Sequence, residues 1–337
     1  MRTTFLPALA LAGAFALGAC GTSQPTADHA DDAESAATTP AAGAGPITLT
    51  DAADRTVELD APAERVVVLE WQQTEDVLTL GVDPVGVADV EGYSTWDTAV
   101  ELDPGTTDVG TRGEPNMDAV FSTDPDLVIV EAERGSPLIK QLEKYEVPVL
   151  VTKGADGADP IANMKATFTL IAQALGKDNE ATEVLEEFDA HLAEAQQAIA
   201  DADLETSEFA YADAYLEGSN ISIRPFGQGS LVGELGESLG LTNVWDGEVD
   251  PAYGLGTTDV EGLAAIGDAH FFFTSTDALT DDAGSDPWMP ALEKNAIWQN
   301  AAFVKADRVH PFPSGVWTFG GPRSAEQVVD GFVDALT

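Results

Sequence analysis

The fold that the sequence predicts is decided by one segment, Asp159-Pro-Ile-Ala-Asn-Met-Lys-Ala-Thr-Phe-Thr-Leu-Ile-Ala-Gln-Ala-Leu-Gly176. Asp159 can cap the first turn of a helix, Pro160 suits its first position, and Gly176 suits its end. The apolar residues between them recur every three or four positions, as on one face of a helix: Ile161, Met164, Phe168, Ile171 and Leu175. We therefore expect one long helix over residues 160–176.

Short apolar runs alternate with helical patterns on both sides of this segment. Before it, strands are predicted at 65–69, 85–88, 127–130 and 148–151, with helices at 74–80, 116–121 and 138–145. After it, a second helix runs to about residue 202, and the strand-helix alternation resumes over 209–216, 231–239, 260–266, 270–274 and 325–336. The pattern predicts an α/β fold with two Rossmann-like lobes, residues 46–159 and 177–337, joined by the helix at 160–176. Ligands of such sheets bind at the carboxyl ends of the strands, which places the expected cleft between the lobes.

The first residues have the features of an export signal. Arg2 precedes an apolar run from Phe5 to Leu17 that is too short to span a bilayer, and small residues lead to Cys20. This pattern predicts a lipoprotein signal peptide at 1–19 and a lipid on Cys20; the alternative is an ordinary secretory signal with an incidental cysteine. Residues 20–45 hold no large apolar residue and read as the lipidated cysteine and a flexible tether. We therefore expect a lipid-anchored protein of the cell membrane, facing away from the cytoplasm.

The charge of the chain limits its partners. It has 59 acidic and 15 basic residues, a formal net charge of -44, which excludes a nucleic-acid binder on electrostatic grounds. The acidity fits either attraction to a basic partner or a solvated acidic shell suited to a saline or alkaline medium. Because the acidic residues are spread along the chain, the shell is the favoured reading.

The sequence assembles no catalytic or metal-binding set. The four histidines are scattered, a nucleophile elbow is missing, and Cys20 is the only cysteine. Gly227-Gln228-Gly229 with Gly233 imitates a dinucleotide fingerprint, but its third glycine comes one position late. A glycine turn that aims a helix at the cleft is the favoured reading there. We therefore expect no enzyme, no metal site of the protein's own and no cofactor.

Arg112 and several loop aromatics are the candidate binding residues. Arg112 lies in a predicted strand-to-helix loop, where a guanidinium is well placed to bind an oxygen-rich ligand; a surface ion pair is an equal alternative. Aromatic residues in predicted loops often wall a pocket for a bulky ligand, although core packing is the commoner role of each one alone. These aromatics are Trp71, Trp96, Trp245, Tyr253, Trp317 and Phe319.

Several motifs carry a resemblance to a known family. They are Arg65-Val-Val, Leu80-Gly-Val, Val109-Gly-x-Arg112-x-Glu-Pro-Asn116, Phe226-Gly with Ser230-Leu, Gly240-x-x-Asn243-x-Trp245, Tyr253-Gly and Trp317-x-Phe319-Gly. From Arg65 to its end the chain resembles the periplasmic binding proteins in which a rigid helix joins two lobes, and which serve ABC importers of iron-siderophores and cobalamin. Within that family it is most similar to ferric hydroxamate-siderophore-binding proteins.

The resemblance implies a function and a set of site residues. The chain would capture a ferric siderophore of the hydroxamate type, whose own oxygens hold the iron. Arg112 would contact the hydroxamate oxygens, and Tyr253, Trp317 and Phe319 would line the second-lobe wall, while Trp71 is a candidate from its predicted loop position alone. Arg134 stands where the family has a ligand-contacting Tyr, Tyr253 replaces a Trp, and Phe319 replaces a Tyr. A second arginine and fewer phenol groups would suit a more anionic siderophore.

The resemblance also implies partners. Asp118 and Glu234 fall where the family carries acidic residues that meet arginines of the two permease subunits; the alternative is that each is merely solvated. ATP hydrolysis would belong to a separate cytoplasmic ATPase, and we expect the binding protein to be a monomer. The alternatives are a carrier of ferric catecholate, haem or cobalamin, or an exported enzyme or adhesion module on the same scaffold. An enzyme would need a titratable pair in the cleft.

Overall fold

The computed structural model describes residues 45–217, 220–274 and 288–337. The predicted signal peptide, Cys20 and residues 21–44 of the predicted tether lie outside the described residues. None of the described helices is long and apolar enough to cross a membrane.

The first lobe is built on a five-stranded parallel sheet in the order β5-β4-β3-β6-β7. Its strands are β3 (Val66–Val68), β4 (Gly86–Val87), β5 (Thr107–Asp108), β6 (Leu127–Glu131) and β7 (Val149–Thr152). Helices α1 (Trp71–Thr79), α2 (Val90–Trp96), α3 (Met117–Ser122) and α4 (Pro137–Leu142) connect them. Successive side chains of a strand point to opposite faces, so Leu127 and Ile129 enter one apolar cluster while Val128 and Val130 enter another. Both faces of the sheet are thus covered, which explains the continuous apolar strands.

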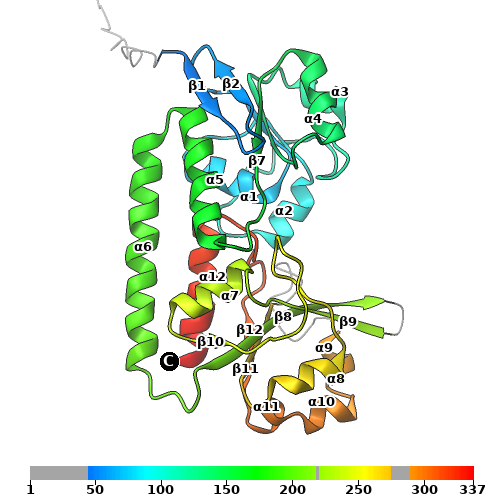
Figure 1. The fold of residues 1–337 in the computed structure, drawn as a ribbon. Coiled ribbons are helices and arrows are strands. Elements are labelled where there is room, and N and C mark those ends of the chain that lie inside the picture. Colours follow the sequence, from blue (N-terminus) through cyan, green and yellow to red (C-terminus); the bar gives the residue numbers. More distant parts are fainter. Residues whose placement is uncertain (1–44, 218–219, 275–287) are drawn as a thin grey trace, which may run out of the picture. The chain divides into compact units, whose positions relative to one another are not determined.

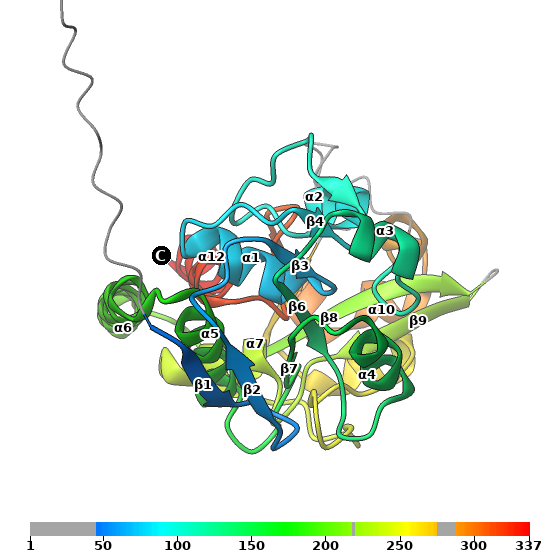
Figure 2. The ribbon, with the colours of Figure 1, turned by 90° about the horizontal axis from the view of Figure 1, so that it is seen from above.

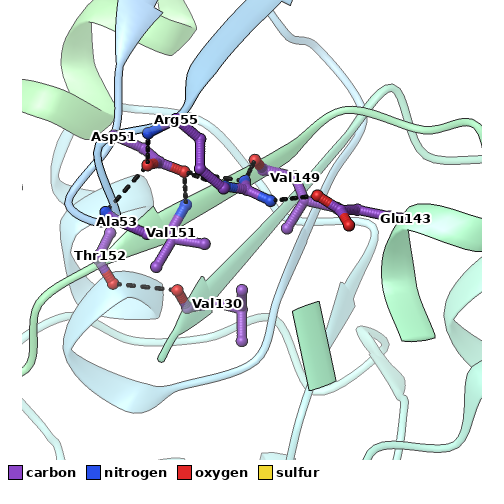
Figure 3. A network of polar contacts seen from close by, with 8 residues as sticks. All are labelled: Asp51, Ala53, Arg55, Val130, Glu143, Val149, Val151 and Thr152. Carbon is purple, nitrogen blue, oxygen red and sulfur yellow. Dashed lines mark hydrogen bonds and ion pairs between the residues drawn. The ribbon is translucent and has the colours of Figure 1, made fainter. Parts of the chain in front are cut away.

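An antiparallel hairpin, β1 (Ile47–Thr50) and β2 (Thr56–Leu59), is joined to this lobe by a buried carboxylate. Asp51 accepts hydrogen bonds from the Arg55 side chain (2.9 Å) and from the backbone N–H of Val151 on β7 (3.2 Å), as Figure 3 shows. Arg55 in turn donates to Glu143 (2.7 Å) and to the Val149 carbonyl. The hairpin is therefore tied to the edge strand of the sheet by polar contacts from two of its residues.

The predicted central helix is confirmed as α5 (Pro160–Leu175). Asp159 accepts a hydrogen bond from Ala162 N–H at 3.0 Å, and Gly176 ends the helix with φ of 65°. A second and longer helix, α6 (Asp178–Asp201), follows after two residues. It lies beside α5 and the C-terminal helix α12 (Pro322–Leu336), as Figure 1 shows. Figure 2 shows α6 nearly end on.

Side chains of α5 and α6 enter the cores of both lobes. On α5, Phe168 packs in the first-lobe core and Met164 in the second-lobe core. On α6, Val184 packs in the first-lobe core and Phe188 in the second-lobe core. The 24 residues of α6 are long enough, about 36 Å, to carry the chain from one lobe to the other. Two helices thus share the link, and the division of the chain at residues 159 and 176 stays a prediction.

The second lobe has a mixed sheet in the order β10-β8-β11-β12, with β9 antiparallel to β8. Its strands are β8 (Glu208–Glu217), β9 (Asn220–Pro225), β10 (Thr242–Asn243), β11 (His270–Thr274) and β12 (Val309–Phe312). Its helices are α7 (Leu231–Ser238), α8 (Val260–Leu263), α9 (Met289–Leu292), α10 (Ala296–Asn300), α11 (Ala302–Lys305) and α12 (Pro322–Leu336). Aromatic residues pack on one face of the sheet. Among them, Phe272 and Phe332 meet edge to face, with ring centroids 4.8 Å apart. The predicted α/β class with two lobes is confirmed.

A buried carboxylate of the first lobe caps a helix of the second lobe. Glu75, on α1, accepts hydrogen bonds from Gly321 N–H (2.9 Å), Ser324 N–H (2.9 Å) and the Ser324 hydroxyl (2.7 Å). These groups lie at the start of α12, where backbone N–H groups lack helical partners and the helix dipole attracts negative charge. Glu75 thereby supplies an N-terminal cap that the α12 sequence itself does not provide.

Three acidic side chains share this seam between the lobes. Glu75, Asp76 and Asp97 are all buried, and burial raises the pKa of each carboxyl; repulsion between them raises the pKa values of Asp76 and Asp97 further. Asp76 lies against Gly321, where a Cβ would come within 2.2 Å of its Oδ1 atom. A side chain at position 321 would therefore have to displace this buried carboxyl group.

Replacing Glu75 is expected to weaken the seam. Glu75→Ala removes the acceptor of two buried N–H groups, and we expect it to lower the free energy of unfolding by about 3 kcal/mol. Urea unfolding followed by circular dichroism measures the change. Glu75→Gln, which keeps an acceptor oxygen, should lose less, and Glu58→Ala, at an exposed position, should change stability by less than about 0.5 kcal/mol. Equal losses in Glu75→Ala and Glu58→Ala would contradict this account.

The raised pKa of Asp76 predicts a pH dependence with a definite sign. A carboxyl whose folded pKa exceeds its unfolded value stabilises the fold below its ordinary pKa, and this contribution is lost as pH rises through the folded value. Asp76→Asn cannot ionise, so its stability relative to the wild type should increase from about pH 4 to about pH 8. Thermal unfolding across that range checks this, with the exposed Asp60→Asn as the control. A constant difference at all pH values would rule the mechanism out.

Candidate ligand-binding site

A cavity of about 400 Å³ opens between the two lobes. The first lobe contributes five lining residues and the second lobe another five. They are Glu70, Gln72, Arg112, Glu131 and Gly154, and Arg224, Tyr253, Leu255, Trp317 and Phe319.

A second cavity of about 300 Å³ adjoins the first. Four residues line both: Arg112, Arg224, Trp317 and Phe319. Side chains that line only the second cavity include Trp71, Trp96, Asp213 and Tyr215. The two volumes together fall within the range of small-molecule sites, with two arginines and an aromatic pair at their junction.

The parallel sheet places the first-lobe residues. Glu70 follows β3, Arg112 lies in the loop after β5, Glu131 ends β6, and Gly154 follows β7. The carboxyl ends of parallel strands share one edge of a sheet, so residues far apart in sequence meet there. The predicted position of the cleft agrees with this edge.

Arg112 is held in place by a carboxylate and an indole. Its Nη1 atom lies 2.6 Å from Glu70 Oε1, and its guanidinium carbon lies 3.7 Å from the ring centroid of Trp71. Glu70 also accepts the backbone N–H of Trp71 at the start of α1, at 2.8 Å. A guanidinium has five N–H donors, so this pairing leaves donors for a ligand. Arg112 thus forms the ion pair considered from the sequence, but forms it inside the cavity.

Aromatic side chains form a continuous wall from one lobe to the other. Trp71 of the first lobe meets Trp317 of the second edge to face, with ring centroids 4.9 Å apart. Trp317 lies 5.2 Å from Phe319, which lies 5.8 Å from Tyr253. The predicted Trp71, Trp317, Phe319 and Tyr253 are therefore brought together, although Trp71 begins helix α1 and does not lie in a loop.

Tyr253 and Glu131 form a hydrogen bond between the lobes. The Tyr253 hydroxyl donates to Glu131 Oε1 at 2.7 Å, and both residues line the larger cavity. Burial raises the pKa of Glu131 although the tyrosine hydrogen bond opposes the shift. Burial and the neighbouring carboxylate raise the pKa of Tyr253, so its hydroxyl remains a donor.

Arg224 is a cavity residue that the sequence analysis missed. It lies opposite Asp213 in the β8–β9 hairpin, and its Nε atom donates to Asp213 Oδ1 at 2.9 Å. Its guanidinium carbon lies 5.6 Å from the ring centroid of Phe319. The alternation Ile221-Ser222-Ile223-Arg224 indicates a strand with a basic residue on its polar face, a rare choice in this acidic chain. Glu70 and Glu131 were also missed, although both directly follow apolar strand runs.

Arg134 lies outside both cavities, which corrects the expected second arginine of the site. Its side chain is 69% exposed and its Nη1 atom lies 3.3 Å from Asp54. Arg134 lies in the turn after β6, three residues beyond Glu131. Of the other aromatics predicted in loops, Trp96 ends helix α2 and lines the smaller cavity, whereas Trp245 packs against a core cluster of the second lobe.

The two acidic residues considered for docking differ in their surroundings. Asp118, in the first turn of α3, is exposed. Glu234, in the first turn of α7, is half-buried, and its pKa is raised by burial and by the nearby Glu237 and Asp159.

The glycine motif serves packing between the lobes. Gly229 has φ of 82°, and a Cβ there would come within 2.6 Å of the Gly157 carbonyl oxygen of the first lobe. A side chain at this point would push the lobes apart. The motif is therefore the turn that the sequence favoured.

Two histidines that the sequence separates lie together. His270 Nδ1 and His310 Nε2 are 2.9 Å apart on β11 and β12, and burial lowers the pKa of His270 to about 4. Across residues 45–217, 220–274 and 288–337, no group of three or more His, Cys, Asp or Glu side chains is arranged to hold a metal ion.

Comparison with known proteins gives relatives that cover most of the chain. It is 30% identical over 270 residues to the iron(3+)-hydroxamate-binding protein FhuD of Escherichia coli, covering 79% of this chain and 84% of that protein. It is 31% identical over 266 residues to the Fe(3+)-citrate-binding protein YfmC of Bacillus subtilis, covering 78% of each.

Solved structures share the fold. The Fe3+-Desferal-bound siderophore-binding protein FhuD of Vibrio cholerae matches with a TM-score of 0.66 at 22% identity, over 81% of this chain and 97% of that one. Residues 66–314, which include both sheets and the helices between them, match the periplasmic binding protein family. The chain belongs to the periplasmic binding protein family.

Proposed function

We propose that this protein captures a ferric siderophore of the hydroxamate type outside the cytoplasm and delivers it to an ABC importer for iron uptake. The observation that carries the proposal is the cavity between the lobes, where Arg112 on the Trp71 ring faces the second-lobe aromatics Trp317, Phe319 and Tyr253. A charge-assisted donor and an aromatic wall suit a ligand with polarised oxygens and apolar linkers.

Binding would proceed without chemistry on the ligand. A ferric siderophore encloses its iron in its own oxygen atoms, so the protein needs no metal ligand and no cofactor. Arg112 would donate to the hydroxamate oxygens, a contact worth roughly 1.5–3 kcal/mol, while the aromatic residues bury the apolar parts. The relatives named for hydroxamate and for citrate complexes support an iron complex as the ligand.

We further propose how the loaded protein meets its importer. Asp118 and Glu234 would dock on arginines of the two permease subunits, with a separate ATPase on the cytoplasmic side. A lipid on Cys20 would keep the protein at the outer side of the cell membrane, and the segment after Cys20 would give it slack to dock. The protein would act as a monomer.

The alternative ligands are ferric citrate, ferric catecholates, haem and cobalamin, and an exported enzyme or adhesion module is the alternative outside this class. A binding panel of ferric hydroxamates, ferric citrate, a ferric catecholate, haem and cobalamin, read by tryptophan fluorescence quenching of the mature protein, tests them together. Saturable binding of a ferric hydroxamate supports the proposal. Binding only of another member of the panel would replace it.

Arg112→Ala should weaken binding of the ferric hydroxamate about tenfold or more, because it removes a charge-assisted donor. Titration by fluorescence quenching gives the dissociation constant of each variant. Arg134→Ala is the matched control and should bind like the wild type, because Arg134 lies outside both cavities. An unchanged affinity in Arg112→Ala would remove Arg112 from the site.

Cys20→Ala should release the protein from the membrane with ligand binding intact, since the thiol would serve only as the site of lipid attachment. Fractionation of cells that express each form, followed by immunoblotting, measures the distribution. A variant that still sediments with membranes would contradict the anchor.

A further inference from the structure

The charges that line the two cavities are nearly balanced. Three carboxylates, Glu70, Glu131 and Asp213, face two guanidiniums, those of Arg112 and Arg224. The described part of the chain brings no lysine to either cavity lining. With all of them ionised, the cleft carries an excess of negative charge before any ligand enters.

Each arginine of the cleft already has a carboxylate partner. Arg112 pairs with Glu70 at 2.6 Å, and Arg224 donates to Asp213 at 2.9 Å. Both pairs are at least partly shielded from water, Glu70 and Asp213 each being 18% exposed. A strongly anionic ligand would therefore have to compete with these carboxylates for the guanidiniums.

Glu131 differs from the other two carboxylates. Its hydrogen-bond partner is the neutral hydroxyl of Tyr253 at 2.7 Å, and it forms no ion pair within the described residues. The hydrogen bond fixes the carboxylate at the end of β6, where it lines the cavity. Glu131 is thus the one of the three cleft carboxylates that has no guanidinium ion pair among the described residues.

The net charge of the whole chain also disfavours anionic ligands. A net charge of -44 repels anions from the protein and attracts cations toward a cleft with low-dielectric walls. This long-range repulsion disfavours the binding of ferric catecholates, which are strongly anionic. A ferric tris-hydroxamate is favoured instead, because its three hydroxamates balance the charge of Fe(III).

We propose that Glu131, positioned by Tyr253, is a specificity-determining residue that selects a ferric hydroxamate bearing a free ammonium group. The inference rests on the proposed function and narrows its ligand to complexes of net positive charge. It replaces the more anionic siderophore expected when Arg134 was placed in the site.

A pair of ligands that differ only in this charge tests the proposal. Ferrioxamine B carries a free ammonium group, and N-acetylation removes its charge while leaving the iron-binding groups unchanged. We expect the wild-type protein to bind ferrioxamine B at least about fivefold more tightly than the acetylated complex, the ratio that one charge pair about 4 Å apart gives even in a water-like dielectric. This comparison needs no variant, so it does not depend on the folding of a mutant.

Variants then assign the preference to Glu131. Glu131→Gln should bring the two dissociation constants within about twofold of each other, mainly by weakening ferrioxamine B. Glu133→Gln, an exposed glutamate two positions along, should keep the wild-type ratio. Tyr253→Phe should reduce the ratio without abolishing it, because it removes the positioning hydrogen bond and leaves the charge.

The outcomes separate this inference from the proposed function. Equal affinity of the wild type for the two complexes, or a ratio that survives Glu131→Gln, overturns the inference and leaves a hydroxamate carrier. Tighter binding of a ferric catecholate or of ferric citrate overturns both. If neither form of ferrioxamine binds and ferrichrome does not bind either, the proposed function fails and the inference fails with it.

Discussion

The hydrogen bonds from the start of α12 to Glu75 are the contact on which the arrangement of the binding site depends. Glu75 lies one helical turn after Trp71, so both point from the same side of α1. The segment from Trp317 to Gly321 leads directly into α12. When Glu75 holds Gly321 and Ser324, it also fixes where Trp317 meets Trp71, at 4.9 Å. A buried acid away from the cavity thus sets the aromatic contact that closes one of its sides.

Basic side chains are few in this protein, and most of the described arginines are used for ion pairs within the chain. The chain has 59 acidic and 15 basic residues, and several of its arginines pair with carboxylates of the same chain: Arg55 ties a hairpin to a sheet, and Arg308 pairs with Glu205 and Asp268. The arginines of the cleft follow the same rule. A site assembled in this way offers hydrogen-bond donors without an excess of positive charge. The cavities therefore present guanidiniums although the chain is strongly acidic, each guanidinium lying beside a carboxylate.

The sequence predicted the fold well because apolar periodicity reports burial directly. The runs Val66–Val68 and Leu127–Val130 became strands covered on both faces, and Pro160–Leu175 became a helix between its predicted ends. Among the residues that line the two cavities, Arg112 and five aromatics were candidates from the sequence: Trp71, Trp96, Tyr253, Trp317 and Phe319. Arg134 was expected in the site from its position in the family's pattern, but its exposed side chain pairs with Asp54, a contact between distant residues that the pattern does not encode. Glu131 and Arg224 were missed because their roles arise from contacts with residues more than ten positions away, which periodicity does not encode.

The edge-to-face pair of Trp71 and Trp317 gives the protein an optical property of its own. Two indoles at this separation couple their electronic transitions, so their circular dichroism depends on the angle between the rings as well as on the distance. Because the rings belong to different lobes, that coupling reports the relative orientation of the lobes. Any rotation of one lobe against the other should therefore change the circular dichroism spectrum of the native, unlabelled protein.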